Sequence, residues 1–182
     1  MESLTKSTKH LEKLKLQIHM KKLPEWFASL DCLHTLYLFK NFLTEDPFPI
    51  LGKLPSLAIL TLASSAYINS TVNVPRGGFP KLKLLRILGM ENWTNWMPIE
   101  KGSFPEIQFL LIADCPRLTS LPDGFNHLTS LDDLTLMGTS LVFAHKLQNR
   151  DKWKISHAKE VSIISEVNGQ IVKTKFKSSP IS

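Results

Sequence analysis

A six-residue pattern of leucines, Leu-x-x-Leu-x-Leu with isoleucine allowed, recurs along this chain of 182 residues. The pattern begins at residues 11, 33, 57, 82, 107 and 131, so successive starts lie 22, 24, 25, 25 and 24 residues apart. Near-constant spacing is typical of repeat proteins, in which one unit cannot bury its apolar side alone and stacks on its neighbours. The repeat therefore constrains the fold more than any other feature of the sequence does.

Within each motif the apolar residues alternate with a period of two, which predicts a short strand with its leucines on one side. The segments 23–30 and 121–128 share the pattern Leu-Pro-x-x-Phe-x-x-Leu, which suits a helical turn on a return path. We therefore predict an α/β fold, a leucine-rich-repeat right-handed solenoid with a concave parallel β-sheet of about six or seven strands and an irregular convex side. Leu60, Leu85 and Leu110 should point into the core.

The fourth repeat allows a second register that starts three residues later, at Leu85. Phe79-Pro80 precedes Leu82 by the same offset as Phe104-Pro105 precedes Ile107, so the earlier register is favoured. On the return path, helical spacing places the tryptophans at 93 and 96 in a convex-side core.

The pattern divides the chain into four parts. Residues 1–10 form a polar lead-in, residues 11–140 six repeats of about 24 residues, residues 141–176 a helix and hairpin that cap the stack, and residues 177–182 a tail.

The cap prediction rests on local signals. Thr139 or Ser140 can cap a helix running to about residue 150, with Leu141, Ala144 and Leu147 on one side. Asn-Gly at 168–169, between segments of strand character, predicts a two-residue hairpin turn. We expect the cap to bury the tryptophan at 153 and to present its lysines outward.

The net charge of +6 is confined to the two ends of the chain. Residues 1–22 carry six lysines against two acids, and residues 141–182 carry eight basic groups against three acids, whereas residues 23–140 sum to −3. Basic ends are typical of solvated or partner-facing edges, so the distribution argues against a nucleic-acid partner. No stretch is long and apolar enough to predict a membrane span.

Signals for catalysis are absent from the sequence. No histidine pair has metal-ligand spacing beside a carboxylate, and no phosphate-binding loop or nucleophile elbow occurs. Cys32 and His34 are interpreted as packing and surface residues, and Cys115 as a structural residue of a turn. We therefore expect a protein that is not an enzyme and that binds no cofactor.

Four stretches resemble the C-terminal leucine-rich-repeat region of plant intracellular disease-resistance proteins of the nucleotide-binding, leucine-rich-repeat class, the coiled-coil type in particular. These stretches are Phe79–Leu85 running on to Trp96, Phe104–Ile107, the Cys-Pro-x-Leu-x-x-Leu-Pro run at 115–122, and Trp153–His157. The similarity extends over about residues 11–165.

The resemblance implies a non-catalytic recognition module of a cytoplasmic immune receptor. It implies as partners a pathogen effector or a guarded host protein, and the nucleotide-binding domain of the same receptor or of a paired one. The chain itself lacks that switch domain, so we expect a fragment or a stand-alone repeat product. Two alternatives stay open: the substrate-binding arm of a ubiquitin-ligase adaptor, and an extracellular receptor ectodomain with the sequons at Asn69 and Asn92.

If the motif leucines point inward, the residues between them line the concave sheet. Apolar side chains dominate the middle of this surface, with Lys13 and Lys15 at one margin and Asp132 and Asp133 at the other. An apolar centre with charged margins is typical of a protein interface. The predicted protein-binding residues are Tyr37, Phe39, Ile59, Thr61, Leu84, Arg86, Leu88, Phe109, Leu111 and Asp133.

Overall fold

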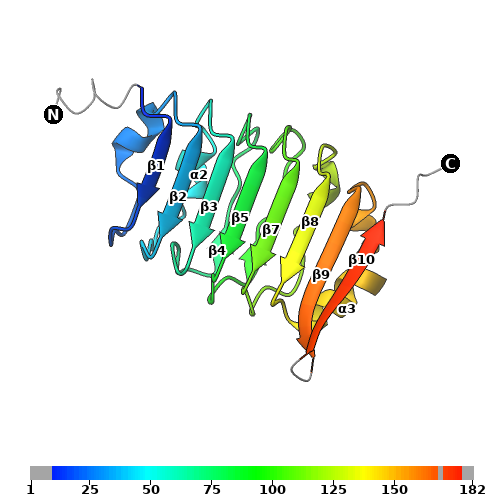
Figure 1. The fold of residues 1–182 in the computed structure, drawn as a ribbon. Coiled ribbons are helices and arrows are strands. Elements are labelled where there is room, and N and C mark those ends of the chain that lie inside the picture. Colours follow the sequence, from blue (N-terminus) through cyan, green and yellow to red (C-terminus); the bar gives the residue numbers. More distant parts are fainter. Residues whose placement is uncertain (1–9, 168–169, 178–182) are drawn as a thin grey trace.

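The computed structural model describes residues 10–167 and 170–177, and one sheet runs through them from end to end (Figure 1). It has eight strands in the order β1-β2-β3-β5-β7-β8-β9-β10. Their bounds are β1 Lys13–Leu16, β2 Thr35–Phe39, β3 Ile59–Ala63, β5 Leu84–Leu88, β7 Phe109–Ala113, β8 Asp133–Met137, β9 Glu160–Val167 and β10 Gln170–Lys177. The first seven strands pair in parallel, whereas β10 runs antiparallel to β9. The parallel part of the sheet thus has seven strands, within the range expected, and the antiparallel β10 adds an eighth.

Each repeat strand holds the alternating part of its motif in register with the next repeat. The central leucines stand opposite one another and are buried, as the sequence predicts: Leu36, Leu60, Leu85, Leu110 and Leu134. In the fourth repeat Leu82, Leu85 and Ile87 are at most 1% exposed, which confirms the earlier register. Burying a leucine contributes about 1.5–3 kcal/mol, so the shared core stabilises the whole stack.

A left-handed residue follows each of the strands β2, β3, β5, β7 and β8. These residues are Lys40, Ser64, Gly89, Asp114 and Gly138, with φ between 47° and 65°. This conformation turns the chain off the sheet at the same point in these five repeats. At Gly138 a side chain would also collide with its neighbour, since an added Cβ would lie 2.5 Å from a carboxylate oxygen of Asp114.

The return side is more ordered than the irregular convex side that was expected. Besides η1 (Glu25–Ser29), α2 (Phe48–Leu51) and η2 (Phe125–His127), it holds β4 (Thr71–Val72) and β6 (Asn95–Trp96), which pair in parallel as a second, two-stranded sheet. Trp93 and Trp96 are 1% and 6% exposed, so both lie in the core as predicted.

The Phe-Pro phenylalanines form part of that core. The rings of Phe79 and Phe104 stack with centroids 4.7 Å apart, and Phe48 meets Phe79 edge-on at 5.5 Å. Phe79 and Phe104 have positive φ, 60° and 52°, a conformation that carries a steric cost outside glycine. Stacking of one repeat's ring on the next offsets that cost.

Polar side chains tie each repeat to the one before it. Asn41 donates to the Ile18 carbonyl at 2.9 Å, and Asn92 donates to the Ile68 carbonyl at 3.1 Å, and both steps are one repeat long. Asn69 makes the equivalent bond to the Thr44 carbonyl. These bonds pair carbonyls of the turns with side chains of the next repeat and help to fix the spacing between repeats. Both sequon asparagines, Asn69 and Asn92, therefore have their side-chain amides in interrepeat bonds.

Past β8 the chain forms α3 (Leu141–Asn149) and η3 (Lys152–Ile155) before it enters β9. The Ser140 hydroxyl accepts the Phe143 amide at 3.2 Å, so the predicted N-cap is confirmed. The buried side of α3 differs from the prediction, because Leu141 is 62% exposed and Phe143 is packed inside with Ala144 and Leu147. Figure 1 shows α3 behind β9 and β10.

Two expectations for this segment are wrong. Trp153 is 53% exposed rather than buried, and Lys154 is 6% exposed rather than outward-facing. The Lys154 ammonium donates to the Leu121 carbonyl at 2.9 Å and to Asp123 at 2.8 Å. Because the ammonium bonds both the buried Leu121 carbonyl and the exposed Asp123 carboxylate, the aliphatic stem packs inside while the neighbouring indole stays outside. The predicted turn at 168–169 and most of the predicted tail lie outside the described residues.

Candidate protein-binding face

The strand face is the sheet surface made by the side chains that alternate with the buried leucines. Strand pairing in register arranges these side chains in three rows across β2, β3, β5, β7 and β8. The rows are Thr35-Ile59-Leu84-Phe109-Asp133, Tyr37-Thr61-Arg86-Leu111-Thr135 and Phe39-Ala63-Leu88-Ala113-Met137. All ten residues named from the sequence lie in these rows, so the fold brings them together on one surface.

Burial differs among these ten residues. Phe109 is 46% exposed and Arg86 is exposed. Seven side chains are half-buried: Tyr37, Phe39, Ile59, Leu84, Leu88, Leu111 and Asp133. Thr61 is only 5% exposed, because its short side chain stands between the longer side chains of Tyr37 and Arg86 on the adjacent strands. Thr61 therefore offers little surface to a partner, contrary to the expectation from sequence.

At the β1–β2 end of the strand face, two aromatic rings support two lysines. Tyr37 and Phe39 stack with centroids 6.1 Å apart. The Lys15 ammonium lies 5.1 Å from the centre of the Tyr37 ring, and the Lys40 ammonium lies 5.2 Å from that of Phe39. We call Lys15, Tyr37, Phe39 and Lys40 the lysine–aromatic cluster. Contact with the ring faces holds the two charges over the sheet.

Three acidic groups on or beside β8 and β9 have partners within the chain. Asp133 accepts the Thr135 hydroxyl at 2.9 Å, and Asp132 lies 2.6 Å from the Lys159 ammonium. Glu160, opposite Asp133 on β9, lies 2.6 Å from Lys175. The hydrogen bond from Lys175 and its charge hold the pKa of Glu160 below its usual range. Asp132 and Asp133 are therefore not the free acidic margin that the sequence suggested, because β9 and β10 continue the sheet beyond them.

The strands β9 and β10 add side chains that were not predicted for the strand face. Register places Ser162 and Ile164 of β9 in the second and third rows, with Lys175 and Lys173 of β10 beside them. The alternation Val161-x-Ile163 was the available signal in the sequence. It indicated a strand but not its place beside β8.

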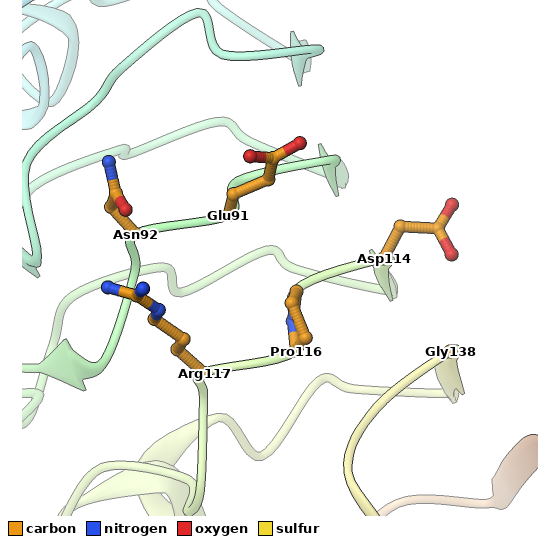
Figure 2. Close-up of a pocket in the computed structure, with 6 residues that line it drawn as sticks. All are labelled: Glu91, Asn92, Asp114, Pro116, Arg117 and Gly138. Atoms are coloured by element: carbon orange, nitrogen blue, oxygen red, sulfur yellow. The ribbon is translucent and has the colours of Figure 1, made fainter.

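A shallow hollow lies where the chain leaves β5, β7 and β8 (Figure 2). Six residues line it: Glu91, Asn92, Asp114, Pro116, Arg117 and Gly138. Figure 2 shows the carboxylates of Glu91 and Asp114 pointing away from the Arg117 guanidinium. The polar groups therefore do not converge on a common point, as catalysis or ion binding would require.

The cysteines and histidines show no constellation suited to catalysis. Cys115 is fully buried, and burial raises the pKa of its thiol to about 11, so the reactive thiolate is disfavoured at neutral pH. His34 has a ring nitrogen 3.3 Å from the Thr35 hydroxyl, while Cys32 is an exposed free thiol in the preceding turn. In residues 10–167 and 170–177, no cluster of three or more His, Cys, Asp or Glu side chains is placed to hold a metal ion. No helix of this described part has the length and apolar character to span a bilayer.

Comparison with known sequences agrees with this architecture. A family profile described as "Leucine-rich repeat region" matches residues 1–136. Disease resistance RPP8-like protein 3 of Arabidopsis thaliana is 34% identical over 156 residues, which cover 86% of this chain and 17% of that protein. Disease resistance protein RPP8 is 35% identical over 158 residues, and disease susceptibility protein LOV1 is 34% identical over 158 residues, both from the same plant and with the same two coverages. The chain thus spans about 17% of the length of these relatives.

Proposed function

The chain belongs to the leucine-rich-repeat region family found in plant disease-resistance proteins, and on that premise we propose that it is a non-catalytic protein-recognition module of a plant immune receptor. The observation that carries the proposal is the strand face. A rigid sheet presents Phe109 at 46% exposure among the half-buried leucines 84, 88 and 111. A contiguous apolar surface of this kind in a folded protein is typical of a protein interface.

The proposal extends to the partners and the setting. The strand face would bind a pathogen effector or a guarded host protein, and it would contact the nucleotide-binding domain of the same or a paired receptor in the cytoplasm. The relatives support this, since they carry the names of disease-resistance and disease-susceptibility proteins.

The proposal also includes the overall form of the stack. The strand face would be the concave side of a right-handed solenoid of six repeats over residues 11–140, and residues 141–176 would cap its last repeat. Two contacts support the cap: β9 continues the sheet from β8, and Lys154 reaches back to the carbonyl of Leu121 in the fifth repeat. A terminal unit that covers the last repeat is the usual requirement for a stable stack.

The test compares two variants in which an exposed apolar side chain is replaced by glutamate, at two positions whose native side chains are about equally exposed. Phe109 on the strand face is 46% exposed and Met97 on the return side is 44% exposed. We expect Phe109→Glu to weaken binding to a candidate partner, such as the receptor's nucleotide-binding domain, by roughly thirtyfold or more, as loss of an interface hot spot does. Met97→Glu should bind like the unmodified chain. Isothermal titration calorimetry on folded variants measures both affinities, and equal affinity for the two variants would contradict the proposal.

A further inference from the structure

The charges of the strand face are paired unequally at its two ends. Among the described residues, three acidic groups beside or on β8 and β9 have partners in the chain: Asp132 with Lys159, Asp133 with the Thr135 hydroxyl and Glu160 with Lys175. The cations at the β1–β2 end, and Arg86 on the more central strand β5, are arranged differently. Within the same described part of the chain, no carboxylate lies within ion-pair distance of Lys13, Lys15, Lys40 or Arg86.

These four cations are exposed, and two of them are held against aromatic rings. Lys13, Lys15, Lys40 and Arg86 are all exposed. Two of them, Lys15 and Lys40, rest on the rings of Tyr37 and Phe39, so they are less free than ordinary surface lysines. An approaching anion therefore meets charges that are held at the surface and not neutralised by the chain itself.

A ligand that contacts the lysine–aromatic cluster can also reach the apolar centre of the strand face. Phe109 on β7 is separated from β2 by β3 and β5, which at about 4.8 Å per strand spacing corresponds to roughly 15 Å. An extended peptide covers that distance with about five residues. One short segment lying across the strands can thus contact both the lysine–aromatic cluster and the exposed ring.

We propose that the segment docking on the strand face is a protein segment with acidic residues over β1 and β2 and apolar residues over β5 and β7. This inference rests on the proposed function and specifies the chemistry of the partner. Asp or Glu side chains would pair with Lys15 and Lys40, and aliphatic or aromatic side chains would cover Leu84, Phe109 and Leu111.

A single-stranded nucleic acid would also meet cations and rings on this face, but it fits the centre poorly. Bases bind through stacking on aromatic side chains. The central positions are aliphatic at Ile59, Leu84, Leu88 and Leu111, and only Phe109 there offers a ring. Leucine and isoleucine instead complement apolar side chains of a protein.

The experiment selects phage-displayed random peptides on the purified chain at physiological ionic strength, with counter-selection on the Phe109→Glu variant. We expect the surviving peptides to be enriched in Asp and Glu together with Leu, Ile and Phe. Their binding to the Lys15→Glu/Lys40→Glu variant should be weaker by roughly fivefold or more, since two ion pairs become repulsive. The matched control is Lys101→Glu/Lys152→Glu, which changes two exposed return-side lysines and should leave binding unchanged.

The possible failures are distinguishable. Peptides that require Phe109 but carry no acidic bias, or that bind the Lys15→Glu/Lys40→Glu variant equally well, would overturn this inference and leave the proposed function standing. Failure to obtain any peptide that requires Phe109 would count against the proposed function and against this inference with it. A third outcome is that a single-stranded oligonucleotide binds more tightly than the selected peptides. If the Lys15→Glu/Lys40→Glu variant loses that binding, the lysine–aromatic cluster would be assigned to nucleic acid instead.

Discussion

The repeat body (residues 11–140) and the C-terminal segment (residues 141–177) are held together in different ways. In the repeat body each contact recurs in the next unit: leucine opposite leucine, Phe79 stacked on Phe104, and an asparagine bonded one repeat back. In the C-terminal segment the decisive contacts occur once. Lys154, a buried lysine bonded to the Leu121 carbonyl, has no equivalent elsewhere in the described chain.

This difference determines how each region should respond to the loss of one contact. A contact copied through a stack can be lost once while its neighbours keep the local geometry. A single anchor such as Lys154 has no copy, so its loss should affect the whole C-terminal segment. The strand face runs across both regions. Lys15 and Lys40 lie at its β1–β2 end, whereas the paired acids Asp132 and Glu160 lie where the two regions meet.

The largest effect is expected from a cavity in the repeat body. Leu85→Ala removes a fully buried side chain from the centre of the stack and should cost about 2–5 kcal/mol of unfolding free energy. The control is Leu84→Ala on the same strand, whose half-buried side chain faces outward and whose loss should cost clearly less. Urea denaturation measures both, and a larger cost for Leu84→Ala would contradict the inward orientation of the motif leucines.

A smaller effect is expected from the anchor of the C-terminal segment. Lys154→Met keeps the aliphatic stem but leaves the buried Leu121 carbonyl without its donor, which should cost about 1–3 kcal/mol. Lys152→Met changes an exposed lysine two residues earlier and should stay within about 0.5 kcal/mol. Equal denaturation midpoints for the two variants would show that Lys154 does not hold the segment.

Sequence reasoning succeeded where a periodic constraint acts. The spacing of the leucines fixed the strands, their register and the ten residues of the strand face, because a shift by one residue would expose every leucine of a strand. The Phe-Pro phase even resolved the ambiguous fourth repeat. Thr61 was misjudged, since its burial depends on the size of the side chains beside it on two other strands.

Outside the leucine motifs, patterns among residues close in sequence predicted the structure only in part. The Ser140 cap could be predicted because it depends on residues three positions apart. The sequence predicted a buried Trp153 and outward-facing lysines, whereas Trp153 is exposed and Lys154 is buried. The position of Lys154 depends on a carbonyl and a carboxylate more than 30 residues away, which no local pattern encodes. The two-stranded sheet of β4 and β6 was missed for the same reason, because each strand is two residues long and forms only beside the other.

The C-terminal segment should also respond to pH. His157 lies near the Phe125 ring, 6.3 Å between centroids, and burial lowers the pKa of its imidazole below the ordinary 6.5. The unfolded chain therefore binds a proton at His157 before the folded one does, so stability should fall as the pH drops from 6.5 through the lowered pKa. Denaturation midpoints across this pH range measure the loss. His157→Gln should flatten the dependence, and an unchanged slope in that variant would assign it to other groups.

The smallest effect is expected on the strand face. Phe109→Glu should change the free energy of unfolding by less than about 1 kcal/mol, because the ring is already half in water. A thermal melt checks this value. A loss as large as that of Leu85→Ala would place Phe109 in the core and remove the main support for the strand face as a docking surface.

The most direct measurement is thiol accessibility along a single strand. Single cysteines replace Phe109, Leu110, Leu111 and Ile112 of β7 in turn, in a background in which the exposed Cys32 is serine and the buried Cys115 is kept. The cysteines at 109 and 111 should react with a soluble thiol reagent roughly a hundredfold or more faster than those at 110 and 112, which become reachable only when the structure opens. Equal rates at the four positions, or faster reaction at 110 and 112, would contradict a face of free side chains over a core of buried leucines.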